Sequence, residues 1–361
     1  MKWILNFKSH RYWLLFVLSL VLGNAQAQLR SSFPATTSDA PRRVVRYDGI
    51  QVSVPEHIQR VASAWEAQNS VLVMLGAGSK IVATTRYAQQ MKAFRQIVPS
   101  IKDAALATLG HSADVNVEGL IALHPDILFV SEGFPAEKQR QLERAGIAVA
   151  GFHANSIQKL VERVGITGEL LGGDAIVKAQ AYQRYFEHNR QLVAERLKGL
   201  DVRLRKHVYI ASGMARLTSG RPSLNQDWID LAGGINVAEQ WHLGPAHYGS
   251  ANVDLESIMA ADPDVIIAMR SNDARKIAIA PKWHLIRAVQ QHRVYANPRG
   301  LFWWCRETSE EALQFLWLAK VLYPDRFSDI DMTKQTADFY QRFYGTRFSD
   351  IEIREFLHPK G

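Results

Sequence analysis

The sequence predicts an α/β protein of two lobes, each built around a parallel sheet, with one long helix joining them. Three observations lead to this prediction. Short apolar runs of strand character alternate with helical stretches on both sides of a long strand-free segment. That segment has the apolar spacing of a single helix. A unit consisting of a helix, Pro-Asp and a strand occurs twice, once on each side of it.

The first 27 residues have the composition of a cleavable export signal. A basic lead without acidic residues precedes an apolar run from Tyr12 to Leu22, which is short for a bilayer span of about 20 residues. Ala25-Gln26-Ala27 then offers the small residues of a cleavage site. We therefore expect export and a cut after Ala27, with an uncleaved N-terminal anchor as the alternative. Residues 28–43, rich in Ser, Thr and Pro, are expected to form a loose tether.

Charge and cysteine content exclude several classes of protein. The chain has 361 residues, with 43 Lys and Arg against 35 Asp and Glu and a formal net charge of +8. That balance is mild, and no block of basic residues with interleaved aromatics indicates nucleic-acid binding. The single cysteine, Cys305, excludes an intrachain disulfide and a zinc site built from cysteine clusters. No HExxH pattern, P-loop, GxGxxG or GxSxG elbow indicates an enzyme.

Both predicted lobes contain short, β-branched apolar runs. In the first lobe, residues 44–172, Ile127–Val130 is such a run. In the second, residues 200–361, His207–Ala211 and Val265–Ala268 repeat the rhythm, with helical stretches between them. Short apolar strands separated by helices are typical of a parallel sheet covered on both faces.

Residues 173–199, between the two sets of strands, are predicted to form one bridging helix. From Asp174 to Leu197 the apolar residues mostly recur at helical spacing. Asp174 can cap the start of this helix, and Gly199 can stop it. Such a helix of 24 residues would span about 36 Å, enough to cross from one lobe to the other. An ordinary packing helix inside one lobe is the alternative, and the strands on either side favour the bridge.

The repeated unit is the sharpest local feature of the sequence. Val117–Leu128 and Leu255–Ile266 each place a glutamate, Glu118 or Glu256, seven residues before a Pro-Asp pair and a strand. Because proline cannot continue a helix, the pattern predicts a short helix that ends before a buried strand. Two copies with equal spacing indicate two lobes of similar build.

With these units, the chain resembles periplasmic binding proteins of the siderophore, haem and cobalamin type over residues 49–357. Further matching stretches are Leu142–Ile147, Ala232–Ala238, Trp317–Lys320 and Phe343–Gly345. The resemblance implies two Rossmann-like lobes bridged by one helix, a periplasmic monomer without catalytic activity or intrinsic cofactor, and an inner-membrane ABC permease with its cytoplasmic ATPase as partner. It also implies that Glu118 and Glu256 pair with arginines of that permease. Two merely solvated carboxylates are the alternative.

Ligand-binding residues are expected after the strands and before the two glutamate helices, because ligands of parallel sheets collect at the carboxyl ends of the strands. With two lobes facing each other, those loops would line a cleft. The candidates are Tyr87, His111, Glu132, Arg216, Trp228, His247, Tyr248, Trp303 and Arg306. Arginines suit oxyanions, and Trp and Tyr faces suit flat ligands, so the set indicates an anionic metal chelate.

The predicted ligand is a ferric siderophore-type complex, with the metal entering only as part of it. Haem or a cobalamin stacked on Trp303 is one alternative. A nickel or cobalt chelate whose metal is coordinated by His111 is another. Trp228 is also suited to core packing. Two hypotheses from other classes remain, a periplasmic enzyme and a sensor domain on the same fold.

Overall fold

The computed structural model describes residues 42–360 except 111, 154 and 244–249, and residues from Arg42 onward form one compact unit. The predicted export signal and most of the predicted tether lie outside the described residues. Strand β1 (Arg42–Tyr47) includes the last two residues of the predicted tether. Within the described part of the chain, no helix has both the length and the apolar character that a membrane span needs.

The first lobe is built on a five-stranded parallel sheet in the order β5-β4-β3-β6-β7. Its strands are β3 (Val61–Ser63), β4 (Ile81–Thr84), β5 (Ala105–Leu106), β6 (Ile127–Ser131) and β7 (Ala148–Phe152). The helices between them are α2 (Glu66–Met74), α3 (Arg86–Gln90), α4 (Lys92–Ile97), α5 (Val117–Leu123) and α6 (Ala136–Arg144). A separate antiparallel hairpin pairs β1 with β2 (Ile50–Pro55).

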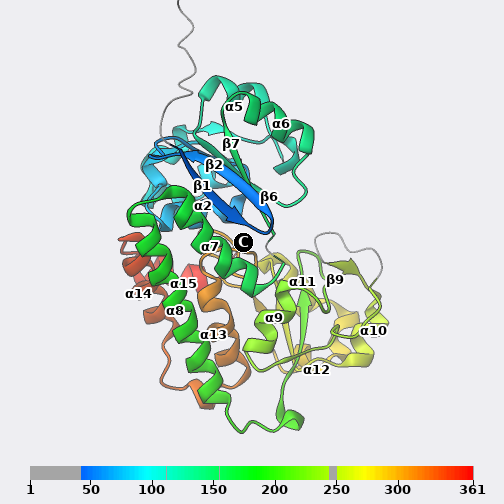
Figure 1. The fold of residues 1–361 in the computed structure, drawn as a ribbon. Helices are drawn as coiled ribbons and strands as arrows, with labels where there is room; N and C mark the ends of the chain where they lie inside the picture. Colours follow the sequence, from blue (N-terminus) through cyan, green and yellow to red (C-terminus); the bar gives the residue numbers. More distant parts are fainter. Residues whose placement is uncertain (1–41, 111, 154, 244–249, 361) are drawn as a thin grey trace, which may run out of the picture. The chain divides into compact units, whose positions relative to one another are not determined.

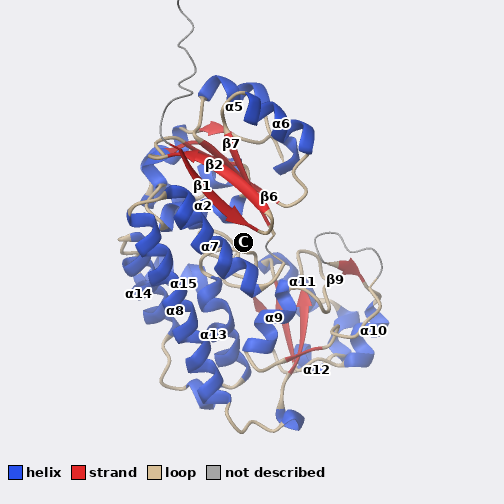
Figure 2. Cartoon of the chain, viewed as in Figure 1, coloured by secondary structure: helices blue, strands red, loops and turns tan. Residues whose placement is uncertain are grey.

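The second lobe repeats this plan with a four-stranded parallel sheet in the order β10-β8-β12-β13. Its strands are β8 (His207–Ala211), β10 (Ile235–Asn236), β12 (Val265–Ala268) and β13 (Val294–Ala296). Its helices are α9 (Leu224–Leu231), α10 (Leu255–Ala261), α11 (Ser271–Ile279) and α12 (Arg287–Gln290), and a two-stranded ladder pairs β9 (Leu217–Thr218) with β11 (Ala251–Asn252). Every residue of β12 is buried, as expected of a strand covered on both faces. Figure 2 shows the strands of both lobes in red.

The two sheets are connected by one long helix, α8 (Asp174–Leu197), which has the bounds that the apolar pattern predicts. The remaining long helices are α7 (Ile157–Leu171), α13 (Glu311–Leu322), α14 (Met332–Tyr344) and α15 (Asp350–Leu357). In Figure 1, α8 is the long green helix beside the orange α13, and the side chain of Asn189 binds the Ala312 carbonyl across that contact at 2.8 Å. The predicted fold class, two Rossmann-like lobes with a single bridging helix, is confirmed.

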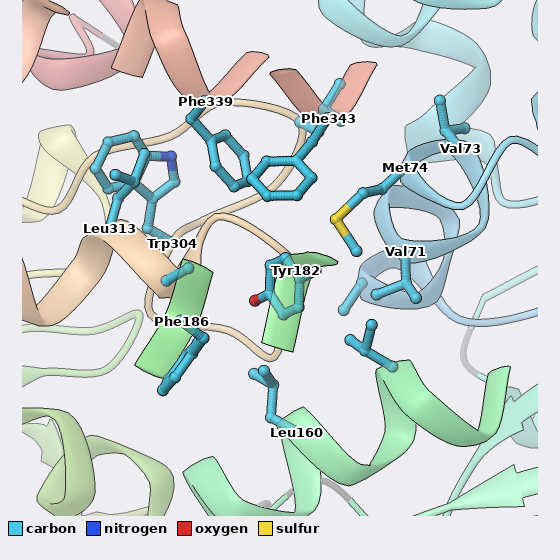
Figure 3. Close-up of a cluster of buried hydrophobic side chains, with 14 of the residues drawn as sticks. Val71, Val73, Met74, Leu160, Tyr182, Phe186, Trp304, Leu313, Phe339 and Phe343 are labelled. Carbon is cyan, nitrogen blue, oxygen red and sulfur yellow. The ribbon is translucent and has the colours of Figure 1, made fainter. Parts of the chain in front are cut away.

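The core of the protein runs through α8 and does not stop at a lobe boundary. Tyr182 and Phe186 of α8 are buried, and Tyr182 meets Phe343 of α14 edge-on, with 5.8 Å between ring centroids. Figure 3 shows Tyr182 with Phe343 on one side and Leu160 of α7 on another. The Tyr344 hydroxyl also donates to the Ser70 carbonyl of α2 at 3.1 Å. The C-terminal helices, which the sequence-based division places in the second lobe, therefore also contact the first.

Both copies of the repeated unit form the same local structure. The helices α5 and α10 are seven residues long and begin at a side-chain cap, Asn116 or Asp254. Both end at a residue in the left-handed conformation, His124 with φ 45° or Asp262 with φ 40°, directly before the proline. The left-handed residue turns the chain out of the helix, and the proline prevents its continuation. The prediction of a short helix ending before a buried strand is confirmed.

Candidate functional site

A cavity of about 840 Å³ lies at the carboxyl ends of both sheets. From the first lobe it is lined by residues that follow β3, β4, β6 and β7, and from the second lobe by residues that follow β8, β12 and β13. This is the edge at which parallel sheets place their ligand-binding loops. The cavity, called the cleft below, thus draws on both lobes, as the fold class predicts.

One wall of the cleft is an aromatic cluster that joins the two lobes. Tyr87 at the start of α3 meets Phe302 edge-on, with ring centroids 5.1 Å apart, and Trp303 at 5.8 Å. The Arg299 guanidinium lies 4.8 Å from the Trp303 ring centroid, and its Nε donates to the Tyr87 hydroxyl at 3.2 Å. Burial raises the pKa of Tyr87, so the phenol stays neutral and can accept this bond. The wall therefore presents flat apolar faces held in place by hydrogen bonding and cation–π contact.

The floor of the cleft contains Trp65 with a buried cation beneath it. The guanidinium of Arg163, on α7, lies 4.2 Å from the Trp65 ring centroid and is 1 % exposed. Its Nη2 donates to the Glu307 carbonyl, while Nε and Nη1 have no hydrogen-bond partner among the described residues. Burial lowers the pKa of Arg163 to about 10, which still leaves it charged at neutral pH.

Glu311 is a second buried ionisable group that interacts electrostatically with this cation. Its side chain is completely buried, and neither oxygen has a hydrogen-bond partner among the described residues. Burial, and then the nearby Glu307, raise the pKa of Glu311 well above its ordinary value, against the opposing effect of Arg163. The raised pKa favours the neutral, protonated form of Glu311 over the charged one, so this carboxyl balances the charge of Arg163 less than an ionised one would.

The rim of the cleft carries charges of both signs. The Arg306 Nε lies 3.7 Å from a carboxylate oxygen of Glu307, and Arg270, which is exposed, forms no ion pair with a described residue. On the first lobe, the Glu132 carboxylate lies 2.5 Å from His153 Nδ1. The second lobe adds neutral donors, since Asn225 Nδ2 binds the Ser212 hydroxyl at 3.0 Å. The rim can therefore bind oxyanions through arginine and neutral oxygens through serine and asparagine.

The structure brings four of the predicted ligand residues together and separates others from them. Tyr87, Glu132, Trp303 and Arg306 line the cleft. Arg216 does not; it directly precedes β9, and its side chain is exposed. His111, His247 and Tyr248 lie outside the described residues.

The prediction that Trp228 binds ligand needs correction. Its side chain is completely buried in α9, and its indole Nε1 donates to Asn225 Oδ1 at 3.2 Å. The ring packs in the core under the cleft and has no surface with which to touch a ligand. Sequence reasoning missed Trp65, Phe302 and Asn225, which also line the cleft. Trp65 follows β3, so the expectation that ligand-binding residues follow strands could have identified it. No local sequence pattern indicates that Asn225 lines the cleft.

The described residues contain no group of three or more His, Cys, Asp or Glu side chains arranged to hold a metal ion. Cys305 borders the cleft, but its thiol is buried, and burial raises its pKa far above the ordinary value. The thiolate form needed for metal binding or nucleophilic attack is therefore disfavoured.

The two repeated glutamates occupy equivalent, exposed positions. Glu118 is the second residue of α5, and Glu256 is the second residue of α10. Among the described residues, neither forms a hydrogen bond or an ion pair. Both carboxylates are thus accessible to a partner.

Comparison with known proteins identifies the class. Residues 61–299 match the periplasmic binding protein family, and the chain belongs to that family. It is 28 % identical over 327 residues to the molybdate-binding protein MolA of Haemophilus influenzae, covering 82 % of this chain and 89 % of MolA. It is 25 % identical over 252 residues to a cobalamin-binding protein of Halobacterium salinarum, covering 69 % of this chain and 62 % of that protein.

Solved structures lead to the same class. The structure of MolA bound to molybdate matches with a TM-score of 0.74 at 25 % identity, covering 85 % of this chain and 99 % of that one. A periplasmic solute binding protein from Veillonella parvula matches with a TM-score of 0.76 at 25 % identity, covering 88 % and 97 %. This chain is accordingly a substrate-binding protein of an ABC transporter, a class that works with a membrane permease and its ATPase and whose members here are binding proteins rather than enzymes.

Proposed function

We propose that the protein captures an anionic metal chelate, a ferric siderophore-type complex, in the periplasm and delivers it to an inner-membrane permease. The observation that carries the proposal is the cleft itself. A cavity of about 840 Å³ with flat aromatic walls and arginines at its rim suits a large, oxygen-rich organic anion. Ligand contact with both lobes at once would favour their closure, because only differential binding shifts such an equilibrium.

The charge distribution supports an anionic ligand. Arg270 and Arg306 lie at the rim, and the buried Arg163 adds positive potential from below the floor. Glu132, Glu307 and Glu66 also line the cleft, so these cations are partly balanced. An asymmetric ligand, with oxyanion groups against the arginines and a flat aromatic part against Trp303 and Trp65, matches this pattern.

A second candidate ligand is a bare oxyanion such as molybdate. The relationship to MolA favours it, and the arginines at the rim could bind it. A tetrahedral oxyanion is comparable in size to a few water molecules, so alone it would leave most of the cleft unfilled. The aromatic wall would then have no ligand surface to contact, and for this reason we favour the chelate. A tetrapyrrole such as haem or a cobalamin is the third possibility, with stacking on Trp303.

The route to the permease completes the proposal. Glu118 and Glu256, one on each lobe, would bind arginines of the two permease subunits, which suits a monomeric binding protein. The N-terminal segment would direct export and be removed after Ala27. These assignments continue the sequence-based predictions.

The decisive experiment is mass spectrometry and metal analysis of whatever co-purifies with the protein, followed by titration. The probes are ferric tris(2,3-dihydroxybenzoate), sodium molybdate and hemin. We expect the ferric catecholate to bind tightest. Arg306→Ala should weaken binding of the ferric catecholate more at low salt than at high salt, because salt screens a charge at the rim. Arg216→Ala, the same change outside the cleft, should leave affinity unchanged. Tightest binding of molybdate would instead establish an oxyanion carrier, and tightest binding of hemin a tetrapyrrole carrier.

A further inference from the structure

A second cavity, of about 750 Å³, lies in the second lobe at the end of its sheet opposite the cleft. We call it the α13 groove, and its main lining residues are Lys206, Arg293, Trp317, Lys320, Tyr323 and Arg326. Lys206 and Arg293 directly precede β8 and β13, whereas the cleft residues follow these strands. Because the strands are parallel, their amino ends share one edge of the sheet and their carboxyl ends the other. No residue lines both cavities.

The α13 groove has an excess of positive charge. Lys206, Arg293, Lys320 and Arg326 line it, against one carboxylate, Asp325. None of these four cations forms an ion pair with a carboxylate among the described residues. Three of them donate to neutral backbone carbonyl groups instead. Lys320 Nζ donates to the Phe327 carbonyl at 2.8 Å, Arg293 Nη2 to the Val321 carbonyl at 3.1 Å, and Arg326 Nη1 to the Arg196 carbonyl at 2.8 Å.

A further carboxylate, close to the groove residues in sequence, is already occupied. Asp329 follows the groove in sequence and accepts two bonds from the Arg196 guanidinium, at 2.6 Å and 2.7 Å. A bidentate pair of this kind uses both carboxylate oxygens. The lining of the groove therefore keeps more cations than carboxylates, and an external anion can balance this excess.

The inner wall of the groove is apolar and held rigidly. Trp317 and Tyr323 are only 6 % and 8 % exposed, and Met332 and Leu357 extend the same wall. The Tyr323 hydroxyl donates to the Gly233 carbonyl at 2.8 Å and accepts from the Lys206 amide at 3.1 Å, which fixes its ring. A wall that is already ordered loses little conformational entropy when a ligand binds.

We propose that the α13 groove is a second ligand site, for a small amphiphilic anion with an apolar body and an oxyanion head group, in the size range of a medium-chain carboxylate. The head group binds Lys206 and Arg293, and the apolar body lies against Trp317 and Tyr323. Charge complementarity selects the head group, and the apolar wall selects the body. The site is independent of the ligand carried in the cleft.

The test is calorimetric titration of the full protein with decanoate and, separately, with inorganic phosphate. Decanoate should bind, and phosphate should bind at least about tenfold more weakly because it has no apolar body. Lys206→Gln should weaken decanoate at least about tenfold. The Lys206 side chain makes no hydrogen bond within the described fold, so this change removes no internal contact. Lys276→Gln, the same change on the exposed surface of α11, should have no effect.

Binding in the cleft is separated from binding in the groove by Trp303→Ala, which should leave decanoate affinity unchanged. Loss of decanoate binding in Trp303→Ala with normal binding in Lys206→Gln would overturn the proposal, as would absence of measurable decanoate binding. Phosphate that binds as tightly as decanoate would also overturn it, since the apolar wall would then contribute nothing.

Discussion

In the first lobe, the aspartate that follows the repeated proline binds the amino end of the neighbouring strand: Asp126 Oδ2 accepts from the amides of Gln59 and Arg60 at 2.7 Å and 2.8 Å, just before β3. In the second lobe, Asp264 Oδ2 accepts from the His207 amide at 2.9 Å, at the start of β8. The two copies thus use their aspartates alike. A strand that begins beside another needs a partner for its first amide, and the aspartate supplies it.

The arginines that fix the two turns differ. In the first lobe, Arg60 donates to the carbonyls of Leu123 and His124 at the end of α5. In the second, Arg287 forms ion pairs with the carboxylates of Asp262 and Asp264, at 2.7 Å and 2.9 Å. The aspartate is therefore the constant structural part of the unit, and the arginine is a local solution in each lobe. The repeated glutamates take part neither in the contacts of the aspartates nor in those of the arginines, although they recur at the same position of the unit.

The largest change in stability is expected from substitution of the two aspartates. Asp126→Ala and Asp264→Ala should each lower the free energy of unfolding by about 3 kcal/mol, because Asp126 is the charged acceptor of two strand-end amides and Asp264 that of one strand-end amide and of Arg287. Urea unfolding measures the change.

Asp126→Asn and Asp264→Asn are the matched controls. Asparagine keeps an acceptor oxygen without the charge, so each should lose about half as much stability as its alanine counterpart. If alanine at one position had no effect while the other was strongly destabilised, the two turns would not be equivalent.

One buried ionisable group, Glu311 at the start of α13, has no buried carboxyl counterpart among the described residues of the first lobe. Because the pKa of Glu311 is raised in the folded state, its contribution to stability is full below the unfolded-state pKa of about 4.3 and is lost as pH rises toward the folded-state pKa. The loss is at most about 1.4 kcal/mol per pH unit.

Glu311→Gln cannot ionise and should escape this loss. Its unfolding free energy relative to the wild-type protein should therefore increase as pH rises from 5 to 8, as measured by urea unfolding at each pH. Parallel pH profiles for the two proteins would show that Glu311 does not carry a proton in the folded state.

The smallest effects are expected from the arginines. Arg60→Met and Arg287→Met should each lower the unfolding free energy by about 1 kcal/mol or less, because both side chains are partly exposed. The stability loss in Arg287→Met should shrink in 0.5 M salt, because Arg287 forms ion pairs that salt screens. The stability loss in Arg60→Met should persist, because Arg60 binds neutral carbonyl groups. Equal salt dependence would mean that the two turns are fixed by the same kind of interaction.

Sequence alone predicted the elements of the fold better than the side chains of the site. The bridging helix and the two helix–Pro–Asp–strand units follow from local spacing and from the chemistry of proline, so they could be predicted. Trp228 could not be placed, because its burial depends on how α9 packs on the rest of the second lobe. Arg163 was missed for a similar reason, since only the packing of α7 against Trp65 and the Glu307 loop turns an ordinary helical arginine into a buried cation.

Glu118 and Glu256 are the side chains of the repeated unit that form no hydrogen bond or ion pair among the described residues. We predict that the double variant Glu118→Ala/Glu256→Ala abolishes uptake of the co-purified ligand by cells while the purified protein binds that ligand with unchanged affinity. Glu169→Ala/Glu355→Ala, which removes two exposed glutamates elsewhere, should transport normally. Normal uptake in the first double variant, or a large loss of ligand affinity, would contradict a permease-docking role for the repeated glutamates.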